Sequence, residues 1–367
     1  LGAVSFVLNE NQVVVANATV NVRTLVANIV LPPYGQFMDD RLPVNAHSEV
    51  NRSSKNLEVA LVLDITGSMS GSRIVDLKAA ARELVQIVVQ DLQTPYYSKM
   101  SIVPYSMGVN LGSYAAAARG TPPPARSITN ATWATGQSRS ISGITRASPG
   151  VVTSSGHGFV TGDVVWLSGV RGMTQINGGP YRVVRINNNS YSLQYRTSGG
   201  SWAQLNTTSG AGYSNYSSAG AARKCLRDTC SIQVTAASHG LQNGDGVYIA
   251  GVRGMTALND QPYLIFNRAA STFEVSPNSG AAPDDYTSGG SAWCGEDGCQ
   301  YRVFRNPSNQ LRALEISSCV SERTGTHAYT SAAPSTALVG RNYPAPGNDC
   351  PSASIQPLTA SKPALTG

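Results

Sequence analysis

The sequence is poor in charged residues and in long apolar segments. Asp, Glu, Lys and Arg make up only 13% of the 367 residues, and the net charge of +6 comes from basic residues scattered along the chain. Scattered charge keeps a protein soluble but does not form the basic patch that nucleic acid requires. No apolar run approaches the ~20 residues that span a bilayer. We therefore expect no nucleic acid partner and no transmembrane helix within this sequence.

The chain also lacks an initiating methionine, because it starts with Leu1. No basic stretch followed by an apolar stretch precedes the first strand-like segment, so a secretion leader is not visible either. We expect the true start to lie upstream, and we expect membrane attachment only through an anchor in that missing part.

Two loop motifs of enzymes are absent as well. A nucleophile elbow has glycines two residues either side of its serine, whereas the centre of GSMSG is Met69. A phosphate-binding loop needs Lys directly after its second glycine, whereas Ser72 follows Gly71. No paired acid and base accompanies Asp64, as a metal-dependent hydrolase would require. These absences predict a protein that is not an enzyme.

Six cysteines are present, and their number is even. In a chain rich in Gly, Pro, Ser and Asn, this favours disulfides and an oxidising compartment. We favour pairing between neighbours, although the sequence permits other connectivities. Zinc held by the two Cys-x4-Cys pairs is the alternative, but the usual Cys-x2-Cys knuckle is lacking. The candidate disulfide pairs are Cys225 with Cys230, Cys294 with Cys299, and Cys319 with Cys350.

The most regular pattern runs from Leu57 to Val88. The apolar run Leu57–Leu63 is short enough to be one buried strand, and it ends in Asp64. A small, hydroxyl-rich loop follows, and apolar residues then recur at helical spacing from Ile74 to Val88. Strand, loop and helix form the first half of a βαβ unit. Asp64 lies at the carboxyl end of the strand, where ligands bind in open α/β sheets.

Three oxygen-bearing side chains alternate in this loop: Asp64, Thr66 and Ser68. In an extended turn, alternate side chains can point to one side. One carboxylate and two hydroxyls form a hard-oxygen set that suits Mg²⁺ or Mn²⁺. In the alternative interpretation, Thr66 and Ser68 only cap the helix and Asp64 only favours its positive end.

The middle of the chain contains an internal duplication. Val152–Gly178 recurs without a gap as Val234–Asp260, so Asp163 corresponds to Asp245. Each copy alternates short β-rich runs with Gly-containing turns, which predicts a small barrel or meander. Three repeated pairs could form a site. We expect the histidines to be turn or core residues, the arginines to bond loop carbonyls or contact a polyanion or glycan, and the aromatic residues to be core. These pairs are His157 and His239, Arg171 and Arg253, and Trp166 and Tyr248.

The D-x-[ST]-x-S loop after a buried strand resembles the metal-ion-dependent adhesion site of von Willebrand factor A domains. Together with VNAHSEV, VPYSMGVNLG, SCVSERTG and CPSASIQPLTASK, the sequence resembles TadG-like proteins of the Flp/Tad pilus-assembly (TadE/G-like) group over residues 1–118 and 315–367. The duplicated HGFxTGDVVxLSGV text resembles the FCCH-like β modules named after ubiquitin-activating enzyme.

These resemblances imply an incomplete α/β von Willebrand A (Rossmann-like) fold, with an N-terminal β layer and a large all-β insert of two tandem repeats. The late Thr and Asp that complete the metal site of A domains are not found before Gly367, so the resemblance implies a fragment with weak affinity for Mg²⁺. The expected domains are an N-terminal β segment at 1–55, the first part of the A-like domain at 56–125, β modules at 144–225 and 226–290, and a cysteine-containing return to the A-like domain at 291–367.

The function implied by the resemblance is pilus assembly or adhesion at the bacterial cell envelope, in the periplasm or at the cell surface. The protein would bind an acidic residue of a protein partner, such as a pilus component, through Mg²⁺ at Asp64, Thr66 and Ser68. The alternative is a surface adhesin that binds glycan through the duplicated modules, with the A domain as scaffold.

Overall fold

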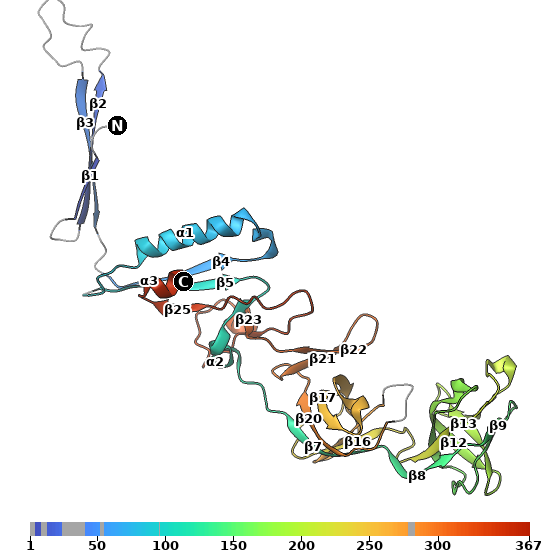
Figure 1. Ribbon diagram of the computed structural model, residues 1–367. Helices are drawn as coiled ribbons and strands as arrows, with labels where there is room; N and C mark the ends of the chain where they lie inside the picture. The colour runs from blue at the N-terminus through green and yellow to red at the C-terminus, as the bar shows by residue number, and fades with distance from the viewer. Residues whose placement is uncertain (1–3, 9–12, 24–40, 52–54, 95, 278–282) are drawn as a thin grey trace, which may run out of the picture. The chain divides into compact units, whose positions relative to one another are not determined.

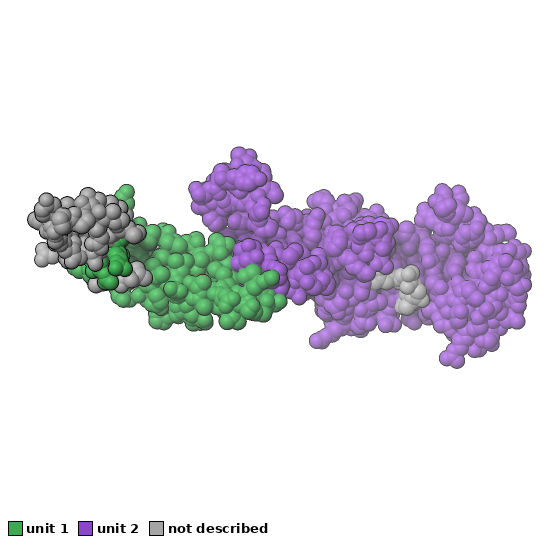
Figure 2. Space-filling model, turned by 90° about the horizontal axis from the view of Figure 1, so that it is seen from above, with its two compact units in different colours: residues 1–63, 69–103, 356–367 green, residues 64–68, 104–355 purple. Residues whose placement is uncertain are grey.

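The computed structural model describes residues 4–8, 13–23, 41–51, 55–94, 96–277 and 283–367 (Figure 1). The chain divides into two compact units, which Figure 2 colours separately. Unit 1 comprises residues 1–63, 69–103 and 356–367, and unit 2 comprises residues 64–68 and 104–355. Among the described residues, no helix combines the length and the apolar character that a membrane crossing requires.

Unit 1 begins with a three-stranded antiparallel sheet of β1 (Val4–Leu8), β2 (Val13–Arg23) and β3 (Arg41–Asn51). Strands β2 and β3 pair along their full length, from Val13 with Asn51 to Arg23 with Arg41. β-branched residues dominate β2, and such residues favour extended backbone.

The rest of unit 1 contains two helices and three strand segments. Its small core buries Val85, Val89, Met100 and Leu365. Strand β25 pairs antiparallel with β5, with Gln356 opposite Ile102. The elements are β4 (Leu57–Asp64), α1 (Ser72–Val88), β5 (Ser98–Tyr105), β25 (Gln356–Thr359) and α3 (Lys362–Thr366).

The expected von Willebrand A fold is wrong. The strand and helix predicted between Leu57 and Val88 form, as β4 and α1, but the described residues contain only two further α-helices, α2 (Ala115–Arg119) and α3, each of five residues. A doubly wound sheet needs helices along both faces. Strand β5 pairs with β4 but has β6 and β25 as antiparallel neighbours, and the described residues contain far more strand than helix. The local βα signal was therefore real, but it did not determine the global architecture.

Unit 2 contains two β modules, one for each copy of the duplicated sequence. We define module 1 as residues 134–225. Its eight strands are β8 (Ala134–Ser140), β9 (Gly143–Ile144), β10 (Val151–Thr153), β11 (Val164–Ser168), β12 (Gly178–Arg185), β13 (Ser190–Arg196), β14 (Trp202–Gln204) and β15 (Ala221–Cys225).

We define module 2 as residues 126–133 together with 226–294. Its strand order is β18-β17-β20-β7-β16-β19. The strands are β7 (Arg126–Thr132), β16 (Ile232–Ala236), β17 (Gly246–Arg253), β18 (Gln261–Leu264), β19 (Thr272–Val275) and β20 (Ser288–Cys294).

The modules are nested, which corrects the expected tandem arrangement. Strand β7 precedes module 1 in the sequence, yet it lies between β20 and β16 in the sheet of module 2. Module 1 is thus an insertion into module 2. Its first and last residues, Ala134 and Cys225, are paired neighbours, and Leu226 N–H donates to the carbonyl of Trp133 at 2.8 Å. Adjacent ends allow a module to be inserted without disturbing its host.

The remaining elements of unit 2 are short. A hairpin of β21 (Tyr301–Arg305) and β22 (Leu311–Glu315) follows module 2. Strand β23 (Cys319–Ser321) pairs with both β6 (Val109–Asn110) and β24 (Gly340–Arg341). One-turn 3₁₀ helices occur at Gly67–Met69, Gly112–Tyr114, Thr174–Ile176, Ser209–Ala211, Thr256–Leu258 and Gly325–His327.

Candidate functional site

The expected metal loop brings its three side chains together, but they bond to one another and to the loop. Thr66 N–H donates to Asp64 Oδ1 at 2.8 Å, and the hydroxyls of Thr66 and Ser68 lie 2.9 Å apart. The backbone hydrogen bond from Thr66, followed by that from its hydroxyl, lowers the pKa of Asp64. Helix α1 has Gly71 as its N-cap and no side-chain cap, so the helix-capping alternative is not observed.

No cluster of metal-ligating His, Cys, Asp and Glu side chains is found in the described part of the chain, where no three or more of them could together hold a metal ion. The loop offers one carboxylate, and that carboxylate already accepts a backbone hydrogen bond. The expected adhesion-type site of an A domain is wrong, because the described residues do not form an A-domain fold around this loop. Binding of Mg²⁺ or Mn²⁺ by Asp64, Thr66 and Ser68 stays a prediction.

The two repeated histidines are buried parts of the framework. His157 Nδ1 accepts the N–H of Phe159 at 3.0 Å, and its Nε2 lies 3.0 Å from the carbonyl oxygen of Asn187. His239 repeats this arrangement with Leu241 N–H at 3.1 Å and the Ala269 carbonyl at 2.9 Å. Since Nδ1 accepts in both cases, Nε2 carries the proton and donates. Neither imidazole is free to act as a base.

Other repeated polar residues are also used structurally. The Asp163 carboxylate accepts the N–H of Val160 at 3.0 Å, and Asp245 accepts that of Gln242 at 2.7 Å. Asn177 bonds both main-chain groups of Val170, at 2.9 and 3.0 Å, and Asn259 does the same to Val252. These residues fix turns, which explains why both copies keep them.

The repeated glycines of the VRGM text have a steric reason. Gly172 has φ +79° and Gly254 has φ +80°. A Cβ at Gly172 would lie 2.2 Å from the carbonyl oxygen of Asn215, and one at Gly254 would lie 2.1 Å from that of Asp285. Only glycine fits this close backbone approach.

The repeated arginines and aromatic residues separate into exposed and packed groups. The side chains of Arg171 and Arg253 are exposed, and neither bonds to another described residue, so the expected carbonyl bonds are not found. Trp166 is 4% exposed and belongs to the core. Tyr248 is half-buried and stacks on Tyr301 with ring centroids 4.1 Å apart.

Each module ends in a disulfide-closed turn. The structure pairs Cys225 with Cys230, Cys294 with Cys299, and Cys319 with Cys350, the neighbour pairing that the sequence favours. No free cysteine is left among the described residues. Three disulfides indicate an oxidising, non-cytoplasmic compartment.

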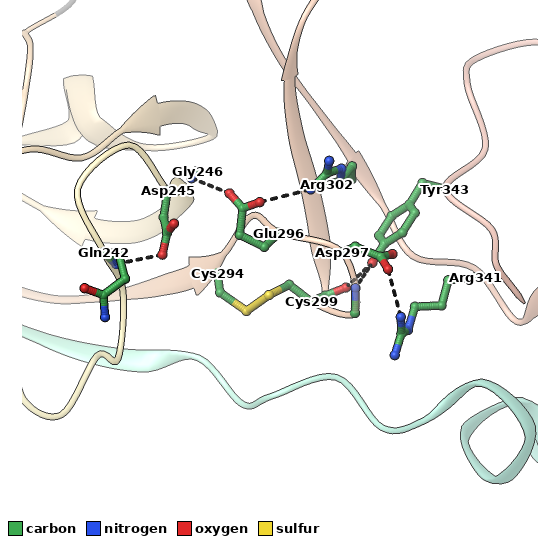
Figure 3. Close-up of polar contacts among 11 residues, drawn as sticks. Gln242, Asp245, Gly246, Cys294, Glu296, Asp297, Cys299, Arg302, Arg341 and Tyr343 are labelled. Carbon is green, nitrogen blue, oxygen red and sulfur yellow. Dashed lines mark hydrogen bonds and ion pairs between the residues drawn. A yellow bond between two sulfur atoms is a disulfide. The ribbon is translucent and has the colours of Figure 1, made fainter. Parts of the chain in front are cut away.

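The second of these turns holds the end of module 2 in place (Figure 3). Glu296 accepts a hydrogen bond from the N–H of Gly246 at 2.8 Å and one from Arg302 Nη1 at 3.1 Å. One carboxylate therefore ties the start of β17 to β21. Asp245, which lies beside Gly246, keeps its own bond to Gln242 and does not join this group in Figure 3.

The same turn contacts the segment around β24. Asp297 forms an ion pair with Arg341 at 2.9 Å. The hydroxyl of Tyr343 accepts the N–H of Gly298 at 3.0 Å and donates to the carbonyl of Cys299 at 2.9 Å (Figure 3). Burial raises the pKa of Tyr343. These contacts connect the disulfide-closed turn to the β24 segment. The residues that make them do not form a catalytic arrangement.

Sequence reasoning missed a buried carboxylate, Glu274 of β19, which contacts the turn closed by Cys225 and Cys230. Glu274 has a side chain only 3% exposed and pairs with Arg227 at 3.2 Å. It also accepts hydrogen bonds from Ser231 Oγ at 2.6 Å and Asn267 Nδ2 at 3.2 Å. The corresponding residue of module 1 is Ser192, so this network belongs to module 2 alone. Comparing the two copies residue by residue would have revealed the change from Ser to Glu.

A second missed feature is a cavity of about 450 Å³ at the outer edge of module 2. It lies beside β18, at the place where β18 and β19 separate. The residues around it are Gln261, Pro262, Tyr263, Leu264, Ser276, Pro277, Arg305 and Leu311. The signal in the sequence was Pro277, which stands where module 1 has Tyr195.

Comparisons with known proteins address the duplicated modules. The Ubiquitin-activating enzyme E1 FCCH domain family matches residues 147–225 and 230–294, which supports the resemblance expected for the duplicated text. No curated protein matches the chain. The matched residues make up less than half of the chain, so the similarity describes the modules. The domain boundaries expected from the sequence stay predictions.

The same findings correct the expected family and function. The matched family is an FCCH domain and the fold is β-rich, so the resemblance to TadG-like and von Willebrand A proteins is not supported. The expected function in pilus assembly through a metal-ion-dependent adhesion site is therefore wrong. The alternative of a glycan-binding adhesin is wrong as well, because it used an A domain as its scaffold. What the observations establish is an extracytoplasmic, disulfide-linked protein with two nested modules similar to E1 FCCH domains.

Proposed function

We propose that this chain is a non-enzymatic binding protein, and that its nested β modules contact a protein partner. One observation carries the proposal: the two modules share one internal framework but differ at an outer edge, where module 2 opens a cavity beside β18. A duplicated scaffold that keeps its turns and varies at an edge is typical of binding domains, in which the framework is kept and the surface is varied.

The absence of enzymatic activity is part of the proposal. The histidines and aspartates repeated in both modules bond to backbone groups of their own turns. A general acid or base must instead reach a substrate. Of these groups, Asp163 also forms an ion pair with Lys224 at 2.6 Å, which uses its second oxygen.

The compartment follows from the disulfides, and we extend it to the periplasm or surface of a bacterial cell. These are the bacterial locations in which disulfides form and persist. The preferred partner is a protein that presents an acidic residue, because basic residues outnumber acidic ones by 27 to 21 and the paired Arg171 and Arg253 are exposed. Opposite charge favours encounter between two proteins.

The test is a selection of short random peptides displayed on phage against the full chain. Folding under oxidising conditions is verified by the absence of titratable thiols. We expect enriched peptides to bind the full chain in solution and to lose binding when residues 126–294 are replaced by a Gly-Ser linker, with Cys299 changed to Ser because its disulfide partner Cys294 is removed. Failure to enrich any peptide, or equal binding to the shortened chain, would overturn the proposal.

A further inference from the structure

The two modules differ most at one pair of strands. In module 1, β12 and β13 pair over five residues, from Arg185 with Tyr191 to Tyr181 with Tyr195. In module 2, the corresponding strands β18 and β19 are not neighbours in the sheet, and among the described residues they share only the bridge between Phe266 and Glu274. Module 1 is closed at this position and module 2 is open.

Pro277 stands at the opening. In the register of module 1, Tyr263 would face Pro277 and Leu264 would face Ser276. By the alternation of the ladder, the backbone of residue 277 would point away from β18, so its missing N–H is not what separates the strands. Strand β19 ends at Val275. The pairing stops after the bridge between Phe266 and Glu274. The cavity of about 450 Å³ lies between the unpaired residues of β18 and residues 276 and 277.

The open edge exposes backbone hydrogen-bonding groups. In an antiparallel ladder, the N–H and C=O of one residue point to the same side, and the next residue points to the other. Phe266 bonds Glu274 on the outer side, and Ile265 N–H bonds the Asp245 carbonyl on the inner side at 3.0 Å. The N–H and C=O of Leu264 therefore face the cavity, where they have no partner among the described residues.

The side chains around the cavity define the chemistry of its occupant. Pro262, Leu264, Pro277 and Leu311 are half-buried and give it apolar walls. Among the described residues that line it, Arg305 is the one that carries a charge, and this side chain is exposed. Its Nη1 donates to the Asn309 carbonyl at 2.9 Å, which leaves the other guanidinium nitrogens available to a ligand.

We propose that an extended segment of a partner protein adds to the free edge of β18 and places an acidic side chain against Arg305. Module 1 shows how the position is filled, because Gln194 and Tyr195 of its own strand β13 lie against Arg182 and Tyr181 there. Addition of a strand to an exposed sheet edge is a common mode of peptide recognition, in which backbone bonds supply affinity and pockets supply specificity. This inference rests on the proposed binding function and locates its site.

The experiment uses a fluorescein-labelled peptide from the selection described above, measured by anisotropy against the full chain. We expect Arg305→Ala to weaken binding about tenfold, the order expected for one charge-assisted hydrogen bond. Arg312→Ala is the matched control: Arg312 is also exposed and lies on the same hairpin, but it does not line the cavity. Its substitution should leave affinity unchanged.

A pair of methylated peptides tests the strand geometry. A peptide with N-methyl groups along one edge should fail to bind, while the same peptide methylated along its other edge should bind normally, because only one edge faces β18.

The outcomes separate the site from the function. Peptides that need residues 126–294 but tolerate Arg305→Ala and methylation of either edge would refute the β18 site and leave the binding function intact. Peptides that do not need residues 126–294 would refute both. Retained thermal unfolding and the absence of titratable thiols in each variant exclude misfolding as the cause.

Discussion

Module 1 and module 2 are built from one repeated sequence, yet one is closed and the other is open. They share the buried histidine, the Asp and Asn turns and the VRGM glycine, each in the same bonds. They differ at the β13 and β19 positions, where β19 ends at Val275 and Pro277 takes the place of Tyr195. A duplicated fold can therefore keep its turns and acquire an open edge in one copy.

The modules also differ in continuity. Module 1 is one continuous stretch, whereas module 2 takes β7 from before the insertion. The second part of the host therefore lacks one strand of its sheet, whereas the insert contains all the strands of its own sheet. The disulfide between Cys225 and Cys230 closes the point at which the chain leaves module 1 and re-enters module 2.

The largest expected effect is on fragments of the two modules. Residues 134–225 should fold alone with a cooperative thermal transition, because all their strand partners are internal. Residues 226–294 should stay unfolded, because β7 is missing from the middle of their sheet. Circular dichroism and amide NMR spectra measure both. Joining residues 126–133 to 226–294 through a Gly-Ser linker should restore folding, and folding of 226–294 by itself would disprove the nested arrangement.

The next effect concerns the glycines at the shared close approach. Gly172→Ala and Gly254→Ala should each destabilise their module by about 3–5 kcal/mol, because the added Cβ meets a backbone oxygen and φ is positive. Gly240 has φ +70° with nothing within 4 Å, so Gly240→Ala should cost only about 1 kcal/mol. Urea unfolding measures all three. Equal costs at the three positions would contradict this steric account.

A smaller effect should distinguish the modules through Glu274. Glu274→Ala should destabilise module 2 by about 2–4 kcal/mol, because it leaves Arg227, Ser231 and Asn267 without their shared acceptor. The matched change in module 1, Ser192→Ala, should cost less than about 1 kcal/mol. Chemical denaturation compares the two, and the prediction fails if Ser192→Ala is the more damaging substitution.

The smallest expected effect is one in which the modules behave alike. Burial raises the pKa of both Tyr181 and Tyr263 to about 12. The folded state holds these phenolic protons more tightly than the unfolded chain, so the associated stability is complete below pH 10 and is lost as the pH rises toward 12. Ultraviolet titration of Tyr181→Phe and Tyr263→Phe should each remove one late-titrating tyrosine. Normal titration of either group would contradict the equivalence of their environments.

The sequence predicted local features better than their assembly. The alternation and spacing from Leu57 to Val88 identified β4 and α1, since these signals are local. The nesting was not predictable in the same way, because β7 lies outside the repeated text and its partners are distant in sequence. The A-domain prediction failed for a related reason: one strand–loop–helix pattern does not specify how many helices follow.

The candidate site shows a similar division. The D-x-[ST]-x-S spacing correctly placed Asp64, Thr66 and Ser68 together, but spacing alone could not show that their oxygens bond within the loop. The cavity at β18 depends on Arg305 and Leu311, which reach it from a hairpin outside the repeat. Only Pro277 was visible in the sequence, through the contrast with Tyr195.

Hydrogen exchange at two corresponding amides tests the central claim most directly. By the alternation of the ladder, Arg182 N–H points into the β12–β13 pairing of module 1, while Leu264 N–H points into the open cavity of module 2. In the full chain without peptide, the Leu264 amide should exchange at least about 1,000-fold faster than the Arg182 amide. Equal protection of the two amides would mean that β18 is already paired, and would contradict the account.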